Sequence, residues 1–282
     1  MVAAAALAHS ACGEENPSPP GGAVDIPRVA QEGPALEHIH GLGINSADDR
    51  LFIATHNGLF SAAAEQRTPQ PVGTNKQDTM GFSVAGPGRF IGSGHPGPGQ
   101  DAPPSLGLIE SRDSGKTWKS ISLAGEADFH VLQSVGGKVY GFDATQGRLM
   151  VSGDDGRSWQ QRTPPANVFG LAIDPDDARR VVASTEDGVF VSKDEGRGWR
   201  PLRGDLAGLL AWPAKDALYV VDGEGQVLVS GDAGAVWKPT GDIGGQPAAF
   251  IAHGEDLYVA LLDGTVKRSV DGGATWTVRT TA

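Results

Sequence analysis

The sequence predicts an all-β protein folded as a six-bladed β-propeller. Three observations predict this fold: a short motif recurs at near-constant spacing, strand-like segments lie between its copies, and glycine (41) and proline (19) are abundant. The motif Ser-x-Asp-x-Gly-x-x-Trp begins at Ser111, Ser152, Ser192, Ser230 and Ser269, so the intervals are 41, 40, 38 and 39 residues. A period of about 40 residues with one turn and one aromatic residue per repeat is typical of a propeller blade.

Each copy of this motif, the Asp box, is expected to build a turn that fixes one blade. The Asp accepts backbone N–H bonds, the Gly takes a position that needs positive φ, and the Trp packs between blades. These residues are therefore expected to hold the scaffold and to carry no chemistry. The aspartates with this structural role are Asp113, Asp154, Asp194, Asp232 and Asp271. Of the six Trp, only Trp212 lies outside the motif.

Alignment on the Asp boxes gives six repeats of four strands. The second strand of each repeat is rich in β-branched and aromatic residues and begins near residue 51, 89, 139, 181, 218 or 257. The first repeat lacks the box, and the second carries a Gly/Pro-rich insertion over residues 86–104. Terminal and modified repeats are where such deviations are expected. A seven-bladed ring stays open as an alternative, because residues 24–35 could add a strand.

The N-terminal part of the chain predicts export and lipid attachment. Residues 1–12 end in the single cysteine, Cys12, after a small-residue apolar stretch, and this resembles the end of a bacterial lipoprotein signal whose Cys is lipidated. An ordinary N-terminus with a stray Cys is the alternative. Residues 13–35, rich in Pro and Gly, are expected to be a disordered tether, and residues 36–282 the propeller. The expected location is the outer face of the cytoplasmic membrane or the cell wall.

The charge balance limits the partners. With 23 basic and 34 acidic residues the net charge is −11, which argues against binding to nucleic acid or to an anionic membrane surface. An acidic exterior suits cations or neutral partners. No apolar run approaches the length of a membrane-spanning helix, so we expect membrane contact only through the lipid anchor. We expect a monomer.

Positions that differ between repeats are where function is expected, because chemistry is asymmetric and the scaffold is not. The first position of the inner strands holds His40, Met80, His130, Phe169, Ala207 and Ala248. The position two residues earlier holds His38, Asp78, Asp128, Asn167, Asp205 and Gln246. The end of the second strand, which an antiparallel meander returns to the same face, holds His56, His95, Asp143, Glu186, Asp222 and Asp263.

These positions predict a metal site at one mouth of the channel. Its candidate ligands are His38, His40, His56, Met80, His95 and His130. Imidazole with a thioether suits copper, and zinc, which prefers nitrogen, thiolate or carboxylate, is the alternative. Asp78 and Asp128 could bind directly or orient the imidazoles from a second shell. Each residue alone could instead be polar channel lining, a turn residue or, for Met80, core filler.

The Asp boxes and the phrases His38-Ile-His-Gly-Leu, Met80-Gly-Phe and Asp128-Phe-His resemble bacterial sialidase-like (BNR-repeat) propellers, in particular exported lipoproteins called glycosyl hydrolases by homology. The chain is also similar to propellers of the photosystem II assembly-factor type. The resemblance covers residues 36–282 and implies a fold more than an activity. Sialidases use three arginines and a Tyr nucleophile backed by Glu. The inner-strand positions here hold no Arg, and the three Tyr occupy a repeated scaffold position, so sialidase activity is not expected.

Three functions remain as alternatives. The first is an extracytoplasmic, non-enzymatic metal-binding propeller that acts in copper delivery, buffering or resistance, with His38, His40, Met80 and His130 inside and His56 and His95 at the rim. The second is a glycoside hydrolase or other carbohydrate-active enzyme. The third is a scaffold that docks a membrane or extracytoplasmic partner protein. The carboxylates available to the second are Asp78, Asp128, Glu186, Asp205, Asp222 and Asp263.

Overall fold

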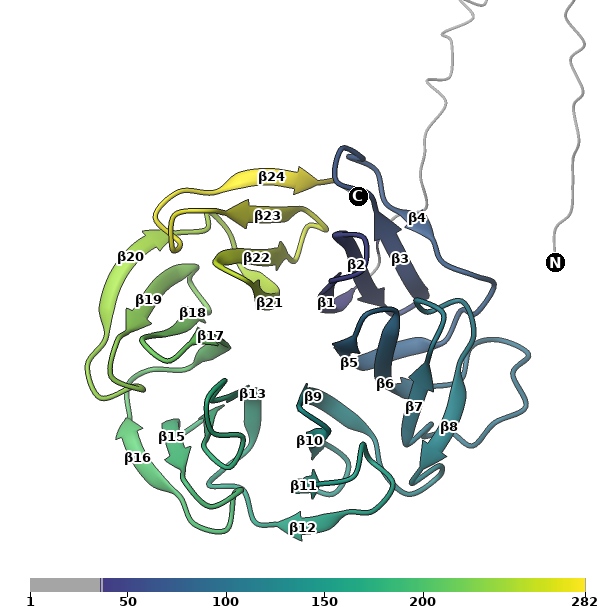
Figure 1. The fold of residues 1–282 in the computed structure, drawn as a ribbon, viewed down its shortest axis with the longest axis horizontal. Coiled ribbons are helices and arrows are strands. Elements are labelled where there is room, and N and C mark those ends of the chain that lie inside the picture. Colours follow the sequence, from purple (N-terminus) through teal and green to yellow (C-terminus); the bar gives the residue numbers. More distant parts are fainter. Residues whose placement is uncertain (1–35, 37, 282) are drawn as a thin grey trace, which may run out of the picture. The chain divides into compact units, whose positions relative to one another are not determined.

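The computed structural model describes residue 36 and residues 38–281, and over these it confirms the six-bladed β-propeller (Figure 1). Six four-stranded antiparallel sheets surround a central channel. The seven-bladed alternative is wrong, because blade one is complete with strands that begin at Ile39. The predicted lipidation site Cys12, the signal remnant 1–12 and the tether 13–35 lie outside the described residues. No helix of the described part is long and apolar enough to cross a membrane.

In every blade, four consecutive strands pair in chain order, from the channel outward (Figure 1). Blade one comprises β1 (Ile39–Asn45), β2 (Arg50–Thr55), β3 (Gly58–Ala62) and β4 (Gln70–Pro71). Blade two comprises β5 (Asp78–Gly86), β6 (Arg89–His95), β7 (Leu108–Ser111) and β8 (Lys119–Ser122). Blade three comprises β9 (Phe129–Val135), β10 (Lys138–Asp143), β11 (Arg148–Ser152) and β12 (Gln160–Arg162).

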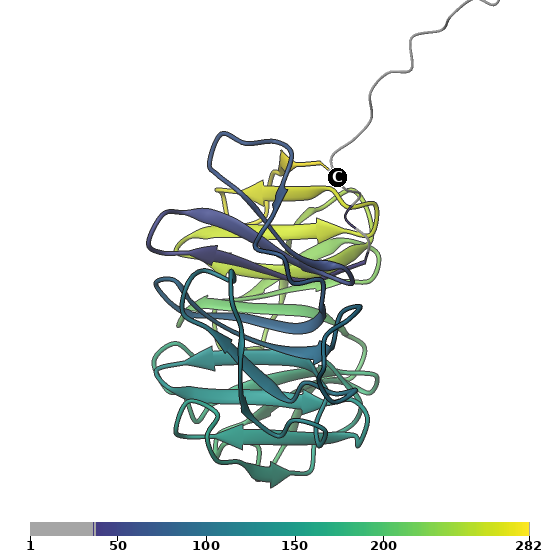
Figure 2. The same cartoon turned by 90° about the vertical axis from the view of Figure 1, so that its right-hand side faces the viewer.

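The other half of the ring follows the same plan. Blade four comprises β13 (Val168–Ile173), β14 (Val181–Thr185), β15 (Gly188–Ser192) and β16 (Arg200–Arg203). Blade five comprises β17 (Gly208–Ala214), β18 (Ala217–Asp222), β19 (Gln226–Ser230) and β20 (Lys238–Asp242). Blade six comprises β21 (Pro247–His253), β22 (Asp256–Leu261), β23 (Val266–Ser269) and β24 (Thr277–Thr280). In side view the strands run between the two faces of the ring, so the turns gather on both faces (Figure 2).

The hydrophobic core is divided into six clusters, one at each interface between neighbouring blades. Between blades one and two, for example, Phe52 and Phe90 meet with ring centroids 4.7 Å apart, and Phe82 packs on Phe90 at 5.6 Å. Sheets pack face to face when apolar side chains cover both faces of each central strand. This explains the almost complete burial of β2, whose pattern of successive apolar residues leaves only Arg50 partly exposed.

The Asp boxes form the turns that the sequence predicts. In the first box the Ser111 hydroxyl donates to Asp113 Oδ1 at 2.8 Å and accepts from the backbone N–H of Gly115 at 2.8 Å. Hydrogen bonds from Thr117 lower the pKa of Asp113 to about 2. Gly115 has a φ of +83°, and a Cβ there would lie 2.2 Å from Leu59 of blade one. The box glycine is therefore required by its φ and by the close approach of the preceding blade.

The ring closes without sharing a strand between its two ends, because β1–β4 and β21–β24 each form a complete blade. At the junction between blade six and blade one, which we call the seam, Arg279 of β24 joins the two blades by hydrogen bonds. Its guanidinium donates to the carbonyl oxygens of Gln66 at 2.8 Å, Ala63 at 2.6 Å and Ala62 at 3.1 Å in blade one. The apolar cluster that contains Ile53 and Tyr258 fills the same interface.

Candidate functional site

The inner strands bring the predicted residues to one mouth of the channel. His40, Met80, His130 and Phe169 line a narrow part of the channel with a volume of about 80 Å³. They come from β1, β5, β9 and β13, which are the first strands of blades one to four. His56, just after β2, and His95, the last residue of β6, return to the same mouth. Their side chains contact Asp78, at the start of β5, and Asp128, just before β9, respectively. The predicted convergence of blades one to three is therefore present in the structure.

A β-bulge sets the direction of the inner-strand side chains. The register of β1 against β2 shifts between Ile39 and Gly41, so His40 has no partner on β2. The same shift leaves Met80 unpaired between Thr79 and Gly81, and β9 is shifted between Phe129 and Val131, around His130. A bulge turns the extra residue out of the ladder and bends the strand. Residues two apart on a regular strand face the same side, and the bulges interrupt this alternation at His40, Met80 and His130. His38, just before β1, has a φ of +47°.

The first cluster of potential ligands, group one, consists of His40, His56 and Asp78. One ligand atom from each lies within 4.8 Å of the other two. His56 Nδ1 is 2.9 Å from Asp78 Oδ2, and His40 Nε2 is 3.4 Å from Asp78 Oδ1. Both His40 Nε2 and Asp78 Oδ1 are buried without a hydrogen-bond partner. Group one therefore contains two orphaned polar atoms that face each other.

The second cluster, group two, consists of His95, Asp128 and His130, again within 4.8 Å of one another. His130 Nε2 is 2.9 Å from Asp128 Oδ2, and His95 Nε2 is 3.4 Å from the same oxygen. Asp128 is only 4% exposed, and its Oδ1 is buried without a partner. The other ring nitrogen of His95, Nδ1, lies 2.8 Å from the carbonyl oxygen of Pro104. This contact favours the tautomer that leaves His95 Nε2 free to bind an ion.

The two groups are neighbours on the same pair of strands. Asp78 of group one is the register partner of His95 of group two across β5 and β6. Directly opposed residues of an antiparallel pair have Cβ atoms about 4.5–5.5 Å apart on the same face. Gly81 lets β5 and β9 approach closely, because a Cβ at that position would lie 2.4 Å from the backbone oxygen of Phe129 on β9. The mouth thus holds two adjoining His–Asp–His groups.

The electrostatics of the two groups differ. Burial lowers the pKa of His40 below its ordinary value, although the nearby Asp78 carboxylate opposes the change. The hydrogen bond to Asp128 raises the pKa of His130, and burial opposes that change. For Asp128, burial raises the pKa, but the hydrogen bond and charge of His130 outweigh it and the net pKa is lowered. His40 is therefore biased towards the neutral form that binds a metal, and His130 towards the protonated form that pairs with Asp128.

Several predicted site residues belong to neither group. His38 stacks loosely against His56, with ring centroids 6.1 Å apart. Met80 lines the channel beside the two groups but is not part of either. Of the other candidate carboxylates, Glu186 is exposed in the turn after β14, and Asp205 pairs with Arg203 at 2.8 Å. Asp143, at the end of β10, pairs with Arg148 at 2.9 Å. Asp222 and Asp263 accept backbone N–H bonds of their own turns, from Gln226 and Thr265 respectively.

Two features of the mouth are visible only in the structure. Asp78 and Asp128 lie at the centre of their groups and contact the imidazoles directly, which fits both of the roles that the sequence leaves open for them. The Gly/Pro-rich insertion of blade two contributes the Pro104 carbonyl that orients His95. His95 itself lies within this insertion, at residues 86–104, and this was the signal that could have indicated such a contact.

Two imidazoles and a carboxylate form a donor set that suits a divalent metal ion. Zinc sites use His nitrogen and carboxylate oxygen at about 2.0–2.2 Å, with an open position for water or substrate in catalytic sites. Such bonds place tetrahedral ligand atoms about 3.4 Å apart, so separations of up to 4.8 Å need only small side-chain movements. The orphaned oxygens Asp78 Oδ1 and Asp128 Oδ1 fit this role, because an ion would supply the partner that each lacks.

Comparison with known proteins finds no protein-family profile that matches the sequence. A xyloglucanase from a Paenibacillus species is 28% identical over 165 residues, which cover 52% of this chain and 14% of that enzyme. The chain thus matches only a small part of that relative's length.

Solved structures are similar at the level of the fold. The GH74 xyloglucanase from Xanthomonas campestris aligns with a TM-score of 0.57 and 18% identity, over 86% of this chain and 45% of that chain. YCF48 from Cyanidioschyzon merolae aligns with a TM-score of 0.54 and 13% identity, over 87% of this chain and 85% of that chain. At these identities the likeness shows the β-propeller fold alone.

Proposed function

We propose that the protein binds divalent metal ions at the channel mouth formed by group one and group two. The observation that carries this proposal is the pair of His–Asp–His groups, each with a buried carboxylate oxygen that lacks a partner. A buried carboxylate is unfavourable unless a cation or hydrogen bonds compensate it. Two groups with separate carboxylates support one ion in each.

The donor set favours zinc over copper. Nitrogen and carboxylate ligands are those that zinc prefers, and the argument for copper rested on the thioether of Met80. Met80 lines the same part of the channel, and the ligand atoms that lie within 4.8 Å of one another in the two groups are imidazole nitrogens and carboxylate oxygens. We therefore propose a zinc-type divalent ion. From the sequence we further propose that the protein is an exported, lipid-anchored monomer that acts in metal buffering, delivery or resistance. Release of a Cys12→Ala variant from membranes would test the lipid anchor.

Metal titration of the full chain tests the proposal. Calorimetry of the metal-free protein with zinc should show two bound ions per chain, and His40→Ala with His130→Ala should weaken both. The matched control is His253→Ala, because His253 lies at the other end of β21, away from both groups. Equal zinc affinity of the double variant and the control would overturn the proposal. Copper tested in parallel shows which ion the mouth prefers.

A glycoside hydrolase is the second candidate, and the comparisons favour it over a copper-handling role. It is supported by the sequence similarity to a xyloglucanase, which covers about half of this chain (52%). Glycosidases use two carboxylates on either side of the scissile bond. Asp78 and Asp128 are the aspartates best placed for this chemistry, because both lie at the mouth and neither is paired with Lys or Arg.

An activity screen separates the two candidates. Xyloglucan and its oligosaccharides, together with cellulose-derived and xylan-derived substrates, are incubated with the protein before and after removal of metal by a chelator. Turnover that survives chelation and disappears in Asp78→Asn and in Asp128→Asn would support the hydrolase. No turnover of any substrate, with tight zinc binding, would leave metal binding as the function of this mouth.

A further inference from the structure

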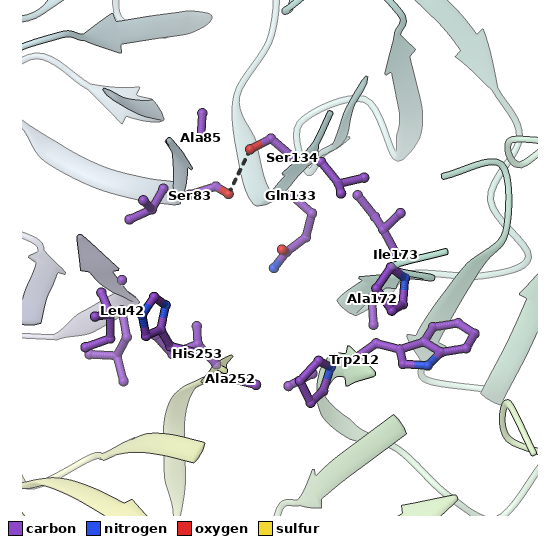
Figure 3. A pocket seen from close by; sticks show the side chains of 18 of the residues that line it. Leu42, Ser83, Ala85, Gln133, Ser134, Ala172, Ile173, Trp212, Ala252 and His253 are labelled. Atoms are coloured by element: carbon purple, nitrogen blue, oxygen red, sulfur yellow. Dashed lines mark hydrogen bonds between the residues drawn. The ribbon is translucent and has the colours of Figure 1, made fainter. Parts of the chain in front are cut away.

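The opposite mouth of the channel holds a larger pocket that the proposed function does not use. It has a volume of about 400 Å³, within the usual range for small-molecule sites. All six inner strands, β1, β5, β9, β13, β17 and β21, contribute to its lining (Figure 3). Trp212, the one Trp outside the Asp boxes, is among the lining residues, and so is His253.

The two cavities adjoin within the channel. The residues that line both of them are Leu42, Phe82, Gln133, Leu171, Leu210, Phe250 and Ile251. Five of these are buried in the apolar clusters between blades: Leu42, Phe82, Leu171, Leu210 and Phe250. None of the His and Asp residues of groups one and two lines the larger pocket, so its chemistry differs from that of the other mouth.

The pocket carries almost no charge. Among the described residues that line it, His253 is the one ionisable side chain, and there is no Asp, Glu, Lys or Arg. An anionic ligand would find no Lys or Arg there, and a cation would find no carboxylate. Because an unpaired charge loses hydration in a partly enclosed site, the pocket favours an uncharged ligand.

Its walls are polar on one side and apolar on the other (Figure 3). The polar wall comes from β5 and β9, where the hydroxyls of Ser83 and Ser134 lie 3.3 Å apart. The Gln133 side chain extends from the same wall into the middle of the pocket (Figure 3). Its amide is partly exposed, and no side-chain hydrogen bond from it occurs within the described residues. The amide therefore offers a free donor and a free acceptor to a ligand.

The apolar wall faces Gln133 and comes from the other half of the ring. It is formed by small and large apolar side chains of β13, β17 and β21 (Figure 3): Ala172, Ile173, Trp212 and Ala252. The same strand positions in different blades therefore carry different chemistry. A difference of this kind within a repeat is a mark of function rather than of scaffold.

We propose that this pocket binds an uncharged saccharide of one or two rings. A pyranose has hydroxyl groups around its edge and C–H groups on its faces, so it can satisfy the amide and hydroxyls of the polar wall while it packs on the apolar wall. A purely apolar ligand would leave the Gln133 amide unpaired, which is unfavourable. This proposal does not depend on metal binding at the other mouth.

Ligand-observed NMR and calorimetry of the full chain with glucose, xylose and cellobiose test the proposal. We expect binding of at least one of them, and about tenfold weaker binding by Gln133→Leu, because the variant keeps the size but loses the hydrogen bonds. The matched control is Gln161→Leu, on the exposed outer strand β12. The metal-mouth variant His40→Ala should bind the saccharide as the unmodified protein does.

A second variant keeps the test valid if Gln133→Leu unfolds. Ala252→Phe fills the pocket from the apolar wall and should abolish saccharide binding while the circular dichroism spectrum is retained. Failure of all three saccharides to bind would overturn the proposal, as would undiminished binding by Gln133→Leu or by Ala252→Phe. Preferential binding of an apolar alcohol of similar size, such as cyclohexanol, would equally overturn it.

Discussion

The two mouths of the channel are built by opposite ends of the same six strands, yet their chemistry is opposite. The mouth where β1, β5 and β9 begin holds two His–Asp–His groups with orphaned buried atoms. The mouth where these strands end holds a neutral pocket whose one ionisable lining residue, among those described, is His253. The repeated sequence gives every blade the same four strands. Residues at one end of an inner strand can therefore differ between blades without changing the residues at the other end.

The difference is largest at Asp128. Its carboxylate is 4% exposed and has two imidazole neighbours, whereas the opposite pocket offers hydroxyls and a carboxamide. Burial of a carboxylate carries a desolvation penalty of several kcal/mol unless a positive partner compensates it. His130 is that partner, because its Nε2 lies 2.9 Å from Asp128 Oδ2 and its pKa is raised by this contact. We propose that a bound metal ion would take the place of a proton on this ring.

The largest expected effect is a loss of zinc affinity at groups one and two, with saccharide binding at the opposite mouth unchanged. Asp78→Asn with Asp128→Asn should weaken zinc binding about 100-fold or more, or roughly 2.7 kcal/mol, because each group loses its anionic ligand. Titration calorimetry with zinc measures this change. Asp205→Asn with Asp222→Asn is the control, since these aspartates lie outside both groups. Weaker saccharide binding by the first pair would contradict the separation of the two mouths.

The seam variant is expected to loosen both mouths together. Arg279→Met removes the donor to three carbonyl oxygens and should lower the free energy of unfolding by about 2 kcal/mol. Urea unfolding measures the loss. Arg268→Met is the control, because Arg268 forms an exposed ion pair with Asp256 and such pairs contribute about 0–1 kcal/mol. Equal losses in the two variants would show that Arg279 does not fasten the ring.

The protonation of His40 in group one and of His130 in group two should depend differently on pH. In an NMR titration of the metal-free protein, His130 should lose its proton at a higher pH than His40, because the pKa of His130 is raised and that of His40 is lowered. The stabilisation from protonated His130 is present below the unfolded-state pKa of about 6.5 and is lost as pH rises through the raised folded-state pKa. An Asp128→Asn variant should remove the upward shift of His130. Titration in the reverse order would refute the assignment.

The smallest expected effect concerns Met80. Met80→Leu conserves volume and should leave zinc and copper affinities within about twofold of the original, because the imidazoles and carboxylates of the two groups are proposed to supply the ligands. Competition with a chromophoric chelator measures both affinities. If the copper affinity of the variant falls tenfold while its zinc affinity is unchanged, the Met80 sulfur is a copper ligand. Copper would then replace zinc in the proposed function.

Much of the fold could be predicted because it is repeated. The serines of the five Asp boxes recur every 38–41 residues, and this period together with the six second-strand segments predicted six blades of four strands, which the structure confirms. The convergence of five His on one mouth followed from the antiparallel meander. Their division into two groups did not follow, because it depends on bulges at His40 and His130 that no periodicity reveals.

The sequence by itself determined the number of blades, the structural role of the Asp boxes and which strand ends carry His and Asp, since these depend on local turns and on spacing. Only the tertiary structure decided how the ring closes, which carboxylate joins which imidazoles, and that Gln133 faces an apolar wall from the opposite half of the ring. The reason is physical: these contacts join residues far apart in the chain, and their geometry is set by blade packing and by bulges.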